Sequence, residues 1–127
     1  MIALLAFAIL ASKPQAPPDR ATKWVTIGQS ANGATLQADV ATFQKSADQR
    51  AVWLRVVNSN PDARNVKTST FLTWLNCTSR TFNLMVSRED DALGKKISER
   101  VYGNSGKGFE RPKPGSAVAN ALTALCR

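Results

Sequence analysis

The segment GNSGKG, residues 103–108, is the part of the sequence most similar to a phosphate-binding loop. A Walker-type loop needs a glycine, four residues and then Gly-Lys-Ser/Thr, and it opens a helix whose N-terminus faces the phosphate. Val101 stands where the first glycine should be, and Gly108 replaces the hydroxyl residue that would hold magnesium. Pro112 and Pro114 separate the loop from any helix. We therefore interpret the segment as a mobile basic loop, and not as a nucleotide site.

The remaining residue types offer little for catalysis. The 127 residues include no histidine and two cysteines, so the usual base at neutral pH and the common zinc ligand sets are missing. The carboxylates of Glu89, Asp90 and Asp91 are consecutive, and in a strand they would alternate between faces instead of forming the opposed pair of a glycosidase. We expect a protein that is not an enzyme, with no cofactor and no metal site.

The charge distribution predicts an anionic partner. The chain has 17 Lys and Arg against 9 Asp and Glu, a net charge of +8. A basic surface attracts acidic proteins, polysaccharides or nucleic acid. We do not expect nucleic acid, because no RNP-type aromatic pattern or DNA-reading helix is visible. The alternative is that the charge only keeps the protein soluble. The candidate contact residues for an anionic protein or polysaccharide are Lys95, Lys96, Arg100, Lys107, Arg111 and Lys113.

The N-terminal residues predict export. Residues 1–16 contain an apolar block of ten residues, 2–11, which fits a signal peptide and is shorter than the roughly 20 residues of a membrane span. Its cleavage site is ambiguous, and a buried N-terminal helix or strand is the alternative. Residues 17–23 are interpreted as a Pro-rich linker, and residues 24–127 as a single domain. We expect no membrane span.

Export would change the chemistry of the two cysteines. In an oxidising compartment Cys77 and Cys126 are expected to form a disulfide, whereas in the cytoplasm they would be two buried thiols. They are 49 positions apart, and closing a loop of that size contributes about 4 kcal/mol in the chain-entropy model. A disulfide would tie the end of the chain to its middle.

The hydrophobic pattern predicts an α+β fold. It indicates a single antiparallel sheet of about five or six strands, with a C-terminal helix packed on it and disulfide-linked to it. Alternation is clearest in residues 51–59, where Val52, Leu54 and Val56 share one face. Residues 42–50 are polar and are interpreted as a connection. The other strand candidates are residues 22–28, 34–40, 67–77, 78–90 and 97–103, with a charged hairpin tip at 88–96.

Two local details refine this prediction. Phe82, Leu84 and Val86 have the opposite parity to the apolar residues of the preceding strand, so a bulge or tight turn must reset the phase between Cys77 and Arg80. Ser116 is a good N-cap, and a helix over 117–125 would carry one apolar stripe. The stripe consists of Val118, Ala121, Leu122 and Leu125.

Several short motifs occur in an order that is informative. These are WVTIGQS, LQADV, VWL, NCTSR and finally PKPGSAVANALTALC. In this order and spacing the sequence resembles the surface-adhesin protein E family of Gram-negative bacteria, over residues 24–126. The resemblance implies an antiparallel sheet, a C-terminal helix and a disulfide between them, with no catalytic residues. It also implies adhesin-like binding of host extracellular proteins such as plasminogen, vitronectin and laminin, and a homodimer as an oligomeric form.

One departure from the family affects the expected location. The adhesin carries a lipid on a cysteine at the end of its signal peptide, whereas the first cysteine here is Cys77. We therefore expect no N-terminal lipid anchor, and a periplasmic or secreted protein. The leading hypothesis is an exported binding module that contacts an anionic macromolecule through its basic C-terminal third. The alternative is a structural or accessory component of a periplasmic envelope assembly.

Overall fold

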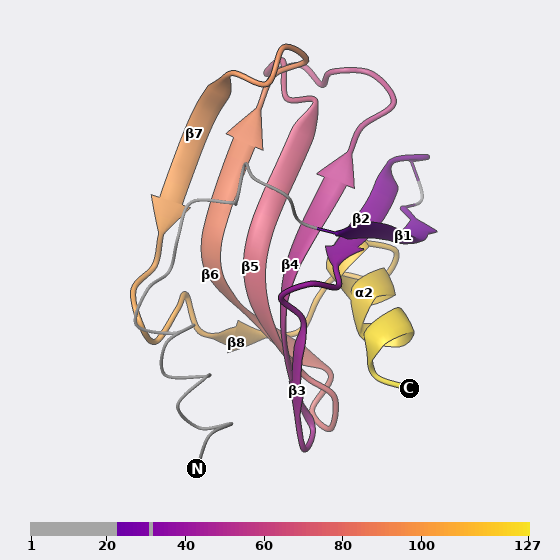
Figure 1. Cartoon of the computed structure of the whole chain (residues 1–127), viewed down its shortest axis with the longest axis vertical. Coiled ribbons are helices and arrows are strands. Elements are labelled where there is room, and N and C mark those ends of the chain that lie inside the picture. The colour runs from indigo at the N-terminus through magenta and orange to yellow at the C-terminus, as the bar shows by residue number, and fades with distance from the viewer. Residues whose placement is uncertain (1–22, 31) are drawn as a thin grey trace.

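The computed structural model describes residues 23–30 and 32–127 (Figure 1). The predicted signal peptide and nearly all of the predicted linker lie outside the described residues. Within the described part, eight strands form one antiparallel sheet and one helix follows them. The elements are β1 (Trp24–Gln29), β2 (Thr35–Asp39), β3 (Gln44–Ser46), β4 (Gln49–Val57), β5 (Thr68–Asn76), β6 (Thr81–Asp90), β7 (Lys96–Val101), β8 (Phe109–Glu110) and α2 (Ala117–Leu125).

The predicted architecture is confirmed, but the strand number of five or six is too low. Six strands form the main path in the order β1-β2-β4-β5-β6-β7, and β3 and β8 are added at its margins. β3 pairs with β4 through a tight turn that contains Ala47 at a φ of 52°. Its residues are mostly exposed, so it lacks the hydrophobic alternation that reveals a half-buried strand. β8 has only two residues and pairs with the start of β6.

Helix α2 packs on one face of the sheet as the apolar stripe predicted. Ser116 is its N-cap, and its hydroxyl accepts the N–H of Ala119 at 3.2 Å. Ala121 and Leu122 are buried against the sheet. This first cluster is built from both layers, with Leu36, Ala38, Val52, Leu54 and Leu75 on the sheet side.

The opposite face of the sheet, here called the open face, carries a second apolar cluster. Trp53, Leu72, Met85 and Val86 are buried there, and Trp24 and Trp74 pack against them. Alternation along β4 explains the division, because Val52 and Leu54 face α2 while Trp53 between them faces the other way.

The predicted phase reset is present, and a second irregularity accompanies it. A turn at 77–80 contains Arg80 at a φ of 58°. A bulge then lies where β5 pairs with β6, because Leu72 opposes Val86 but Thr73 opposes Leu84, which leaves Met85 unpaired. The sequence pattern placed Val86 on the same face as Phe82. The structure corrects this, since Val86 packs in the open-face cluster and Phe82 packs against the α2 cluster.

The predicted disulfide is confirmed. Cys77, just after β5, is bonded to Cys126, the C-cap residue of α2, and their Cα atoms are 5.4 Å apart. The bond joins the helix end to the sheet. No helix in the described part of the chain is long and apolar enough to cross a membrane.

Candidate functional site

The GNSGKG segment is a loop that packs on β6. The side-chain amide of Asn83 donates to the carbonyl of Ser105 at 2.9 Å, and its Oδ1 accepts the N–H of Gly108 at 2.9 Å. The N–H of Lys107 donates to the carbonyl of Leu84, also at 2.9 Å. The loop's polar groups therefore hold the loop onto the sheet instead of cradling a phosphate.

Gly106 explains the glycine in the Gly-Lys pair. Its φ is +68°, and a Cβ built there would lie 2.6 Å from the sulfur of Met85 and even closer to Oδ1 of Asn83. Only glycine fits this position without displacing neighbours. The chain then continues into β8, and α2 begins only at Ala117. Gly106 and its neighbours therefore have a structural role, which is to pack the loop against Asn83 and Met85.

The six predicted contact residues are spread along the β7 side of the sheet. Lys95 lies in the β6–β7 turn, Lys96 and Arg100 lie on β7, and Lys107 lies in the following loop. Arg111 and Lys113 follow β8, beside Phe82 at the start of β6. Lys96 pairs with Asp90, the last residue of β6. Asp90 lies about 26 Å along the strand from Phe82, at roughly 3.3 Å per residue. The six therefore lie toward both ends of the sheet.

They also occupy both faces. Arg100 opposes Ser87, whereas Glu99 opposes Arg88. Successive residues of a strand point to opposite sides. Arg88 lies on the open face, so Arg100 points to the face that carries α2. Lys96 opposes Asp90 and donates to Glu99 at 3.2 Å, so it lies on the open face.

A continuous polar row crosses the open face. Register places Gln37 opposite Arg55, Arg55 opposite Thr70, and Thr70 opposite Arg88. The row continues to Thr26 on β1 and Glu99 on β7. The row lies directly beside Trp53, Leu72 and Val86 of the open-face cluster. On each of these strands the polar residue is the next one that points to the same face. Six strands thus contribute one polar residue each to a single line.

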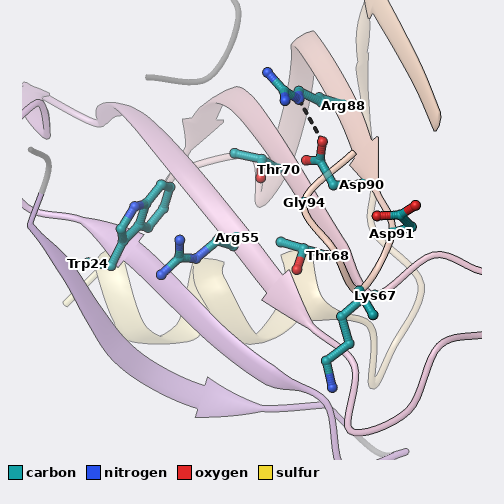
Figure 2. A pocket seen from close by; sticks show the side chains of 10 residues that line it. Trp24, Arg55, Lys67, Thr68, Thr70, Arg88, Asp90, Asp91 and Gly94 are labelled. Atoms are coloured by element: carbon teal, nitrogen blue, oxygen red, sulfur yellow. Dashed lines mark hydrogen bonds and ion pairs between the residues drawn. The ribbon is translucent and has the colours of Figure 1, made fainter. Parts of the chain in front are cut away.

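A groove of about 270 Å³ opens over this row, near the ends of β4 and β6 and the start of β5 (Figure 2). Its charged side chains are three cations and two carboxylates, which leaves a net charge of +1. The lining residues are Trp24, Arg55, Lys67, Thr68, Thr70, Arg88, Asp90, Asp91, Ala92 and Gly94.

Arg55 is the most constrained cation of the groove. Its guanidinium carbon lies 4.3 Å from the centroid of the Trp24 ring, and Figure 2 shows the two side chains next to each other. Its Nε donates to Oε1 of Gln37 at 2.8 Å. Its two Nη groups make no hydrogen bond to any residue that the structure describes. Burial lowers the pKa of Arg55 below its ordinary value, because the guanidinium has lost part of its surrounding water.

The other two cations are also held in place. Nε of Arg88 contacts Oδ1 of Asp90 at 3.0 Å, a pair that Figure 2 shows across the groove from Arg55. Nζ of Lys67 donates to the carbonyl of Ser59 at 2.8 Å. Between the arginines, Thr70 is only 4% exposed, and its hydroxyl has no hydrogen-bond partner within the described ranges. The hydroxyl oxygen is not among the buried side-chain atoms that lack a partner, so solvent or a ligand atom in the groove can reach it.

The three consecutive carboxylates have separate roles. Glu89 accepts hydrogen bonds from Arg64, which lower its pKa, and a further bond from Ser98. Asp90 pairs with Arg88 inside the groove. Asp91 accepts two backbone N–H groups of the β6–β7 turn, those of Leu93 and Lys95. Among residues 23–30 and 32–127, no cluster of three His, Cys, Asp or Glu side chains could hold a metal ion.

The sequence prediction missed the two groove arginines and Trp24. A signal was present in residues 51–59, where Arg55 shares the face of Trp53 in an otherwise apolar strand. A charge on such a strand marks either an edge of the core or a site. The contact partners of Arg55 could not be identified from the sequence, because Trp24 and Gln37 come from two other strands, β1 and β2.

In comparisons with known proteins, no protein-family model matches the chain, and no curated protein matches it.

Proposed function

We propose that this domain is an exported, non-enzymatic binding module that holds an anionic macromolecule against the open face of its sheet. The net charge of +8 and the resemblance to the surface-adhesin protein E family support a binding role. The disulfide supports export, since such bonds persist mainly in oxidising compartments. The groove supplies the contact point.

One observation carries the proposal, and it is the state of Arg55. Its ring contact with Trp24 and its bond to Gln37 fix the guanidinium while both Nη groups remain unengaged among the described residues. An arginine held in this way presents two parallel N–H donors to an incoming anion. Because its orientation is already fixed, binding loses less side-chain entropy than it would at an exposed, mobile lysine.

The basic C-terminal third has a supporting role in this proposal. Lys95 and Lys96 follow Gly94 in the chain, but neither of them lines the groove, so they contribute only to the positive field around it. Lys107, Arg111 and Lys113 lie further away and add to the positive field that attracts an anionic polymer. Such a field raises association rates and is weakened by salt.

The test compares charge loss on the two faces. The full chain is applied to immobilised heparin at rising salt, together with the double variants R55Q/R88Q and R100Q/K113Q. Both variants lose two positive charges, but only the first changes the groove. We expect affinity to fall at least about tenfold for R55Q/R88Q and only a few-fold for R100Q/K113Q.

Two results would contradict the proposal. Equal losses in the two variants would mean that net charge, and not the groove, determines retention. Retention that does not change with salt would mean that the partner is not recognised by charge. Far-UV circular dichroism of each variant checks that the fold is retained.

A further inference from the structure

We infer that the groove binds one carboxylate-bearing sugar residue, a uronate unit within an acidic polysaccharide. This inference rests on the proposed binding function and specifies its ligand. It follows from four properties of the groove: its charge, the geometry of Arg55, the mixture of donors and acceptors, and its size.

The groove charge fits a single negative charge. Although the whole chain carries +8, the groove has a net charge of +1, because Asp90 and Asp91 offset two of its three cations. A phosphate monoester carries about −1.5 to −2 at neutral pH and would bring excess negative charge next to these carboxylates. A carboxylate brings only one.

Arg55 has the geometry that a carboxylate needs. With Nε bonded to Gln37 and one face against Trp24, the guanidinium is left with its end-on pair of Nη donors. Two parallel N–H bonds match the two coplanar oxygens of a carboxylate. Partial loss of water around Arg55 strengthens such bonds, since the local dielectric constant is lower than in bulk water.

The rest of the groove suits hydroxyl groups. Thr68 and Thr70 offer hydroxyls without partners among the described residues, and Asp90 uses only Oδ1 for Arg88. Oδ2 of Asp90 can therefore accept a hydroxyl proton. A run of acidic side chains from a peptide would place further negative charges beside Asp90 and Asp91, which is unfavourable. A uronate combines one carboxylate with several hydroxyls, and so it fits this mixture better.

The size and walls agree with one sugar ring. The volume of about 270 Å³ is just below the roughly 300–1,000 Å³ typical of pockets for drug-sized ligands. The half-buried indole of Trp24 and the methyl group of Ala92 give the groove apolar wall area for the C–H face of a ring. The groove is open to solvent, so a polymer chain can continue on either side of the bound unit.

The experiment titrates the full chain with trigalacturonate and with its methyl ester, which has the same rings without the charge. Two-dimensional NMR follows the indole N–H of Trp24 and the Nε–H of Arg55. We expect the acid to bind at least about tenfold more tightly than the ester. R55K keeps the positive charge but loses the two parallel N–H donors, so we expect it to bind the acid about tenfold more weakly than the wild type. R100Q, on the other face of the sheet, should leave binding of the acid unchanged.

The possible outcomes separate this inference from the proposed function. If dextran sulfate, a polyanion without carboxylates, binds through the groove but trigalacturonate does not, the uronate assignment is wrong and the binding function stands. If neither binds, both are wrong. Hexaglutamate binding as tightly as trigalacturonate would identify an acidic peptide as the ligand, and equal binding of acid and ester would exclude carboxylate recognition. Inorganic phosphate competing at equal concentration would also contradict the assignment.

Discussion

Nε of Arg50 donates to the carbonyl of Leu125 at 3.0 Å, and this bond joins residues 75 positions apart in the chain. Arg50 is only 5% exposed, and its Nη1 also donates to the carbonyls of Ala47 and Gln49, each at 2.9 Å. Leu125 is the last residue of α2, where carbonyls lack helical partners and the helix dipole is negative. A buried strand arginine thus satisfies the C-terminal end of the helix.

Replacing Arg50 should destabilise the fold. In R50M the carbonyls of Ala47, Gln49 and Leu125 lose the donor that the buried Arg50 side chain supplies, and we expect a loss of about 1–3 kcal/mol in unfolding free energy. Urea denaturation measures it. The matched control is K45M, because Lys45 opposes Arg50 on β3 but is exposed, and its loss should stay within about 0.5 kcal/mol. Equal effects of the two variants would contradict the capping role.

The disulfide should contribute a large share of the stability. Removing it in C77S/C126S frees a loop of 49 positions, and we expect a loss of about 4 kcal/mol. A domain of this size has roughly 5–15 kcal/mol in total. Urea denaturation of the variant, compared with the disulfide-bonded wild type in non-reducing buffer, measures the effect. A difference in unfolding free energy below about 1 kcal/mol would show that the disulfide adds little stability.

The sequence predicted the strands and the helix better than it predicted how the strands pair. Alternation of Val52, Leu54 and Val56 correctly identified β4 and its buried face, and the stripe around Ala121 correctly identified α2. Both signals are local, because burial on one face leaves a period of 2 or 3.6 in the chain. β3 and β8 are short and mostly exposed, so they leave no such period.

The groove could not be predicted because it depends on register. The bulge at Met85 shifts the pairing of β5 and β6 by one residue. Without this shift Thr70 would oppose Ser87, and Arg88 would point to the α2 face. The alternation of apolar residues could not reveal the bulge. The turn at 77–80 already explains why the apolar residues of β5 in the α2 cluster have odd numbers and Phe82, at the start of β6, has an even number. The same irregularity explains why Val86, predicted to lie with Phe82, lies on the open face.

Gly106 should not tolerate a side chain. In G106A the new Cβ would overlap Asn83 and Met85, in addition to the strain of a positive φ. The matched control is G103A, because Gly103 has a φ of +84° but no atom within 4 Å of a built Cβ. We expect G106A to be less stable than G103A by about 1–3 kcal/mol in urea denaturation. Similar stabilities would mean that the loop moves away from Asn83 easily.

The Arg64–Glu89 pair should give a small, measurable pH dependence. Hydrogen bonds from Arg64 lower the pKa of Glu89, and a bond from Ser98 lowers it further. A carboxylate whose pKa is lower in the folded state stabilises the fold above its ordinary value, near 4.5, and this contribution is lost as pH falls through the folded value. The effect is small because the Arg64 side chain is 64% exposed.

The measurement compares E89Q with the wild type across this pH range. We expect E89Q to be slightly less stable at pH 7, and the difference to disappear as pH falls below the ordinary pKa of a glutamate. High salt should reduce the difference, since an exposed pair is screened. The control is E110Q, because Glu110 is an exposed β8 carboxylate with no ion pair in the described part of the chain. Identical pH profiles for the wild type and E89Q would show that Arg64 and Glu89 do not pair in solution.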